Sequence, residues 1–69
     1  MVEGTDDKWE GRWDRLRGKA REHFGKLTDD DLEQAKGKRE NLVGRIQEKY
    51  GETRETVELW LKEFEQKHL

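Results

Sequence analysis

The spacing of the apolar residues constrains this chain more than any other feature of its sequence. In the first part of the chain they recur at intervals of 4, 3, 4, 4 and 3 residues, at Trp9, Trp13, Leu16, Ala20, Phe24 and Leu27. Residues three or four positions apart lie on one face of an α-helix, so these side chains form a stripe that needs a partner surface. The pattern predicts a helix over residues 5–24 and an all-α fold.

Three further helices follow from the same reasoning. Thr28 and Thr53 stand where helix N-caps belong, because a threonine hydroxyl accepts a hydrogen bond from the backbone of the following turn. Together with the apolar spacing they predict helices over residues 28–35, 37–50 and 53–67. The expected architecture is a small bundle of two α-hairpins. Its inward positions are Leu32, Ala35, Leu42, Val43, Ile46, Tyr50, Val57, Trp60, Leu61 and Phe64.

Three consecutive aspartates in the segment GKLTDDDL, residues 25–32, admit two interpretations. A calcium-binding loop needs acidic residues at alternate positions, with a glycine at the sixth position and a glutamate at the twelfth. Here the acids are contiguous and run directly into Leu32. We therefore interpret Asp29, Asp30 and Asp31 as the first turn of a helix capped by Thr28, where the helix dipole favours negative charge.

The chain resembles itself when it is shifted by 26 residues. GRWDRLRGKAREHFG, residues 11–25, aligns with GKRENLVGRIQEKYG, residues 37–51, and five of these positions are identical. A threonine-led acidic helix follows each segment. We expect two repeat units, about residues 9–34 and 35–66, each an α-hairpin that buries its apolar stripe against the other unit.

Glycine recurs every seventh residue within each unit, including Gly11, Gly18, Gly37 and Gly44, which fall inside the predicted helices. Each costs a helix about 1 kcal/mol relative to alanine. Helical geometry places this stripe opposite the apolar one. Three interpretations stay open: a smooth surface for another helix or a phosphate backbone, a deliberately weakened helix, or inheritance from a duplicated ancestor.

Composition limits the classes of protein that fit. The 69 residues make one domain, residues 1–69. The chain is 46% charged and 29% hydrophobic, with a mean hydropathy of −1.41, which leans toward disorder. A net charge of only −2 and the strict apolar pattern favour a folded domain with a thin core. Without cysteine or a long apolar run, we expect a soluble cytoplasmic protein with no membrane span.

Catalysis has little support in the sequence. The chain has no serine or cysteine nucleophile, and its two histidines, His23 and His68, are far apart and outside recognised motifs. Two histidines without a ligand-spaced partner do not indicate a zinc site. We predict no enzyme activity, no catalytic or metal-binding residue, no cofactor and no small-molecule substrate.

The segment GKLTDDDL followed by GKRENLVGRIQEKYG resembles the CsbD-like family of small bacterial general-stress proteins. The similarity extends back through WDRLRGKAREHFG, and so covers about residues 13–51. This resemblance implies a cytoplasmic protein produced under general or osmotic stress and a compact bundle of two α-hairpins. It implies no catalytic residue.

We therefore predict a non-catalytic stress-response protein, a hydrophilic protectant under osmotic or desiccation stress, acting as a monomer or weak homodimer. The alternative is a nucleic-acid-binding module in which basic side chains of the duplicated hairpins contact phosphates. An isoelectric point of about 5.7 argues against it. The candidate contacts are Arg12, Arg15, Arg17, Lys19, Arg21, Lys38, Arg39 and Arg45. Membrane-surface binding by the first helix has less support, because the core needs its apolar face.

Overall fold

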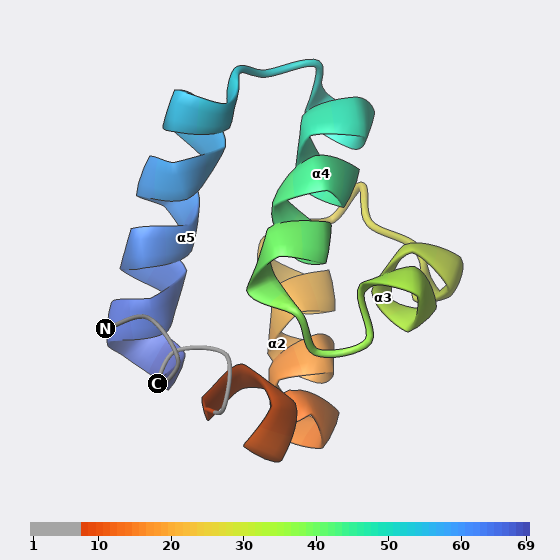
Figure 1. Cartoon of the computed structure of the whole chain (residues 1–69), viewed down its shortest axis with the longest axis vertical. Coiled ribbons are helices and arrows are strands. Elements are labelled where there is room, and N and C mark those ends of the chain that lie inside the picture. The colour runs from red at the N-terminus through yellow and green to blue at the C-terminus, as the bar shows by residue number, and fades with distance from the viewer. Residues whose placement is uncertain (1–7) are drawn as a thin grey trace.

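The computed structural model describes residues 8–69, and within this range the chain forms helices and no strand (Figure 1), which confirms the predicted all-α class. Residues 8–11 are helical and lead into a break at Arg12. The longer helices are α2 (Trp13–His23), α3 (Asp29–Ala35), α4 (Arg39–Tyr50) and α5 (Arg54–His68). None of the helices in this range is long and apolar enough to cross a membrane.

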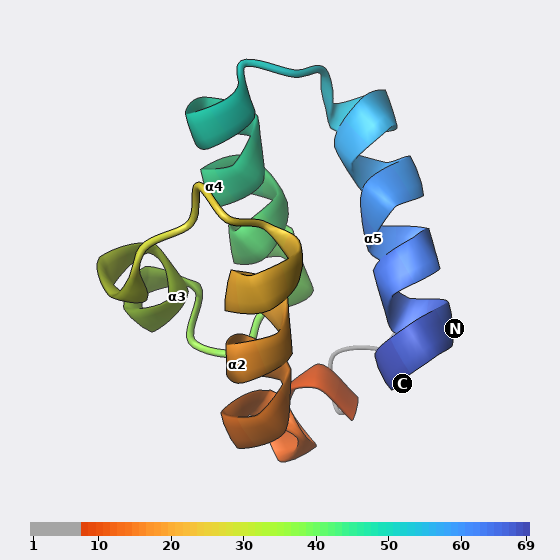
Figure 2. The ribbon, with the colours of Figure 1, turned by 180° about the vertical axis from the view of Figure 1, so that it is seen from behind.

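The helices pack around one core. Figures 1 and 2 show that α2 and α4 rise in the same direction, that α5 returns antiparallel to them, and that α3 crosses beside α4. Both α2 and α4 contact both α3 and α5. The buried apolar side chains come from all of these elements and match the predicted stripes, although Trp13, Tyr50 and Trp60 are only partly buried. They are Trp9, Leu16, Ala20, Phe24, Leu27, Leu32, Ala35, Leu42, Val43, Ile46, Val57, Leu61 and Phe64.

The aspartate segment begins α3, which confirms the capping interpretation. Thr28 Oγ1 accepts a hydrogen bond from the Asp31 backbone N–H at 3.2 Å, and Asp31 Oδ2 accepts from the Thr28 N–H at 3.0 Å. This reciprocal pair satisfies two backbone donors that a helix start otherwise leaves without partners. Thr53 caps α5 through a similar bond from the Thr56 N–H at 3.3 Å.

The prediction of one continuous helix over residues 5–24 is wrong within the described range, and residues 5–7 lie outside it. Arg12 adopts φ −117° and ψ 16°, which is not helical, and α2 starts after it. The break turns Trp9 onto Phe64, with ring centroids 5.8 Å apart, and lets its indole N–H donate to Glu65 at 2.8 Å. Trp9 is fully buried, and its burial stabilises the fold by more than the interruption of the helix costs. That cost is modest because Gly11, beside the break, is a poor helix former.

The predicted start of a helix at residue 37 is also wrong. Lys36 and Gly37 adopt left-handed backbone conformations, with φ of 55° and 76°, and α4 begins at Arg39. A Cβ atom at Gly37 would lie 3.2 Å from side-chain atoms of Trp13, so the absence of a side chain lets the turn lie against the indole. Gly37 therefore does not belong to an exposed helical stripe. At Gly18 and Gly44 an added Cβ atom would meet nothing within 4 Å, as expected for positions away from the core.

The two repeat units remain a prediction. Leu16 and Leu42, which match in the sequence shift, are both fully buried, and Phe24 and Tyr50 both lie at helix ends. The second helices of the two units differ, however, because α3 has 7 residues and α5 has 15.

Candidate functional site

A partly buried ion-pair cluster centres on Arg39, one of the candidate nucleic-acid contacts. Its guanidinium donates to Glu58 at 2.7 Å and to Glu65 at 2.8 Å, and its side chain is only 16% exposed. Glu65 also accepts the indole N–H of Trp9. The hydrogen bond from Arg39 lowers the pKa of Glu58, against the opposing effect of partial burial. Arg39 thus ties α4 to α5 and is turned away from solvent.

A second cluster forms where α3 meets α4, around the buried carboxylate of Asp31. Arg45, another candidate contact, lies 3.5 Å from Asp31 and 3.2 Å from Glu48, and Lys49 lies 3.4 Å from Asp31. Burial alone raises the pKa of Asp31, but the hydrogen bonds from Thr28 and the pairing with Lys49 outweigh it, so this pKa lies below its ordinary value. Asp31 therefore acts as a charged anchor for α4 as well as a cap for α3.

The other candidate basic residues are spread along α2 and the loops. Four of them have partners: Arg17 with Glu33 at 3.7 Å, Lys38 with Glu10 at 3.9 Å, Arg12 with the Leu69 carbonyl at 3.1 Å, and Arg21 with Asp29. Arg15 and Lys19 are exposed, one helical turn apart on α2. The structure thus brings the candidate contacts to several faces, and nucleic-acid binding through them stays a prediction.

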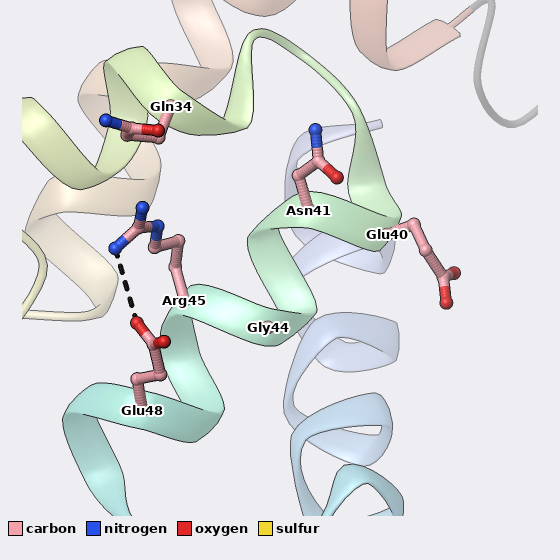
Figure 3. Close-up of a pocket in the computed structure, with 6 residues that line it drawn as sticks. All are labelled: Gln34, Glu40, Asn41, Gly44, Arg45 and Glu48. Carbon is pink, nitrogen blue, oxygen red and sulfur yellow. Dashed lines mark hydrogen bonds and ion pairs between the residues drawn. The ribbon is translucent and has the colours of Figure 1, made fainter.

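A shallow polar groove of about 410 Å³ lies between α3 and α4 (Figure 3). Gln34 reaches toward Arg45 from α3, whereas Glu40 points away from the centre of the groove, and Gly44 leaves the α4 backbone uncovered. Its carboxylates are each held by a cation, Glu48 by Arg45 at 3.2 Å and Glu40 by Arg54 at 2.6 Å. Such paired, open carboxylates lack the apolar surroundings that tune a catalytic acid or base.

Two features of the structure were not deduced from the sequence. His23 and His68 lie far apart in the chain, yet both rings pack near Phe64, at 5.6 Å and 4.6 Å between centroids. The pairing of Arg39 with Glu58 and Glu65 is the second feature. Its only sequence signal is the seven-residue spacing of these two glutamates, which places them on one face of a helix.

Fold and surface together define a small, highly charged all-α domain whose ion pairs join its helices. A family model described as CsbD-like matches residues 7–58, and the chain belongs to this family. A UPF0337 protein of Pectobacterium atrosepticum is 52% identical over 62 residues, which cover 90% of each chain.

Two further relatives extend this similarity. The UPF0337 protein YjbJ of Escherichia coli O6:H1 is 44% identical over 62 residues, again 90% of each chain. A UPF0337 protein of Pseudomonas aeruginosa is 45% identical over 60 residues, 87% of this chain and 92% of its own. These names state no catalytic activity. No solved structure matches the chain.

Proposed function

We propose that this protein is a non-catalytic stress-response protein of the cytoplasm, which shields other macromolecules with a hydrated, charged surface when water becomes scarce. Family membership supports the general class. The composition supports the mode of action, because a chain that is 46% charged with a mean hydropathy of −1.41 presents little apolar surface that would stick to a client protein.

The observation that carries the proposal is the placement of ion pairs across helix boundaries. Arg39 joins α4 to α5 through Glu58 and Glu65, and Asp31 joins α3 to α4 through Arg45. A core this small contributes modest stability by itself. Charge pairs between helices therefore supply part of what holds the domain together.

Ion pairs of this kind strengthen as bulk water is lost. At 4 Å, two unit charges attract by about 4 kcal/mol at an effective dielectric constant of about 20, which is typical of pairs near a protein surface, and the attraction grows as that constant falls. Hydrophobic burial depends on surrounding water, whereas the pairs of Arg39 and Asp31 gain from its removal. The domain then stays folded, and its remaining charged side chains keep a polar layer between dried macromolecules.

A drying assay tests this proposal. A desiccation-sensitive enzyme is dried and rehydrated alone, with this protein, or with an unrelated acidic protein of the same size at equal mass, and recovered activity is compared. We expect the highest recovery with this protein. Recovery no better than with the unrelated protein would refute the protectant role.

A Leu42→Asp variant shows whether protection needs the folded state. Leu42 is fully buried, so a carboxylate there unfolds the domain while leaving its composition almost unchanged. The proposal expects the variant to protect less than the native chain after drying. Circular dichroism before drying verifies that the variant has lost its helices.

A further inference from the structure

A second cavity, of about 210 Å³, is lined entirely by aromatic rings. The four rings are those of His23, Phe24, Tyr50 and Trp60. They come from the end of α2, the end of α4 and the middle of α5, three elements that the fold brings together. Partly exposed aromatic side chains gather here on a surface rich in charged residues, and they make this cavity a place where the protein offers an apolar contact. We refer to this cavity as the aromatic pocket.

The rings of the aromatic pocket are steeply inclined to one another. Tyr50 and Trp60 have centroids 5.4 Å apart with planes at 65°, and Phe24 and Tyr50 have centroids 6.3 Å apart with planes at 84°. Phe24 is buried and forms the floor, Tyr50 and Trp60 are half-buried, and His23 is exposed at the rim. Rings in different planes around one cavity can present electron-rich surface from more than one direction, and groups of aromatic rings recognise quaternary ammonium ligands in this way.

The electrostatics of the aromatic pocket favour positive charge. The C-terminal ends of α2 and α4 carry partial negative charge from their free carbonyl groups, and His23 and Tyr50 are the last residues of these helices. A cation already lies there, since the Lys26 ammonium is 5.1 Å from the centroid of the Tyr50 ring. The Lys26 backbone N–H donates to the Tyr50 hydroxyl at 3.3 Å and so fixes the lysine beside the ring.

Lys26 also limits the chemistry of a ligand that could bind in the aromatic pocket. A second simple cation beside this exposed ammonium would be repelled, whereas a ligand that also carries a carboxylate pairs with it. Methyl groups on the ligand nitrogen suit the apolar lining, because a methylated ammonium loses less hydration on entry than a primary ammonium does.

We propose that the aromatic pocket binds small zwitterions in which a quaternary ammonium group is joined by a short chain to a carboxylate. The methylated ammonium lies against Tyr50 and Trp60, and the carboxylate pairs with Lys26. This inference does not depend on the protectant role. It concerns a ligand that is bound and released unchanged.

A titration followed by two-dimensional NMR tests the proposal, with N,N,N-trimethylglycine as the probe. The chain has three tryptophans, so the indole N–H signals give an internal control. We expect the signal of Trp60 to shift and saturate at concentrations on the order of millimolar, while those of Trp9 and Trp13 stay in place. Equal, unsaturated drift of all three signals would overturn the proposal.

Two analogues separate the two charges of the ligand. In 3,3-dimethylbutanoate a neutral tert-butyl group replaces the quaternary ammonium, and choline lacks the carboxylate. We expect each to bind about fivefold more weakly than trimethylglycine. Equal binding of 3,3-dimethylbutanoate would refute recognition of the cation. Equal binding of choline would refute the role of Lys26.

Variants complete the test. Trp60→Leu keeps an apolar side chain against the core and should weaken trimethylglycine binding about fivefold. Trp13→Leu is the matched control, since Trp13 is also partly buried but lies over Gly37, and it should leave affinity unchanged. Lys26→Met alters only an exposed side chain, so it tests the proposal even if Trp60→Leu fails to fold. It should abolish the preference for trimethylglycine over choline, and an unchanged preference would contradict the proposal.

Discussion

Replacing Arg39 by methionine tests whether ion pairs contribute to the stability of this fold. Removing one partner of a fully buried pair costs about 3–5 kcal/mol, and an exposed pair contributes about 0–1 kcal/mol. Arg39 lies between these limits, because its side chain is 16% exposed and its partners Glu58 and Glu65 are 27% and 19% exposed. We therefore expect Arg39→Met to lower the free energy of unfolding by about 2 kcal/mol.

Thermal unfolding followed by circular dichroism measures this change. For a domain of this size, a loss of about 2 kcal/mol lowers Tm by about 8–16 °C. Arg54→Met is the matched control from the same cluster. Arg54 pairs with Glu40 and Glu58 but is 51% exposed, so its loss should lower Tm far less. An equal effect of the two substitutions, or no effect of Arg39→Met, would refute the reasoning.

The same variant has a predictable pH dependence. In the native chain, the folded-state pKa of Glu58 lies below its unfolded value, mainly because Arg39 donates a hydrogen bond to it. The resulting stability is present above the unfolded pKa of about 4.3 and is lost as pH falls through the folded pKa. Acidification should therefore destabilise Arg39→Met less than the native chain, and identical acid sensitivity in urea titrations would contradict this account.

Four further substitutions test other parts of the structure. Asp31→Asn should destabilise the domain by about 1 kcal/mol at pH 7. Because the folded state holds the pKa of Asp31 below its ordinary value, the difference should shrink only as pH falls through that lowered pKa, as urea unfolding at neutral and at strongly acidic pH would show. Gly18→Ala should stabilise the folded domain by about 1 kcal/mol, because Gly18 lies inside α2 with open space around it. Gly37→Ala should destabilise the domain, because Gly37 has a positive φ and lies against Trp13. Thermal scans in which both variants shift Tm in the same direction would contradict these different roles of the two glycines. Trp9→Phe removes the hydrogen bond to Glu65 and should cost about 1–2 kcal/mol in urea unfolding, with no loss of helix content.

The sequence predicted those parts of the structure that depend on residues close together in the chain, such as helix caps and the buried face of each helix. The capping of α3 by Thr28 depends on residues three positions apart, and the burial of Leu16 and Leu42 follows from helical spacing. The break at Arg12 escaped prediction because Trp9 and Trp13 fit one continuous stripe equally well. Only the distant Phe64, 55 positions along the chain from Trp9, decides that the helix must turn.

The aromatic pocket escaped prediction for a similar reason. Phe24, Tyr50 and Trp60 each occupy an ordinary inward position in a local pattern, and nothing in that pattern states that their rings meet at an opening of the core. The acid partners of Arg39 were equally inaccessible, because surface charges are abundant in this sequence and only packing selects among them. The spacing of apolar residues thus predicted the helices, whereas the contacts between helices could be identified only from the three-dimensional structure.

The hydrogen bond between Trp9 and Glu65 joins regions near the two ends of the chain, and Arg12 donates to the terminal carbonyl of Leu69 close by. Tension applied across the two ends of the described range would therefore act on these contacts before it acts on the contacts of α3 with α4. The hydrogen bonds of Trp9 and Arg12 would then break one after the other, because they would not share the applied force. A pulled molecule would therefore first separate the segment around Trp9 from α5, which also removes the Trp9 ring from Phe64.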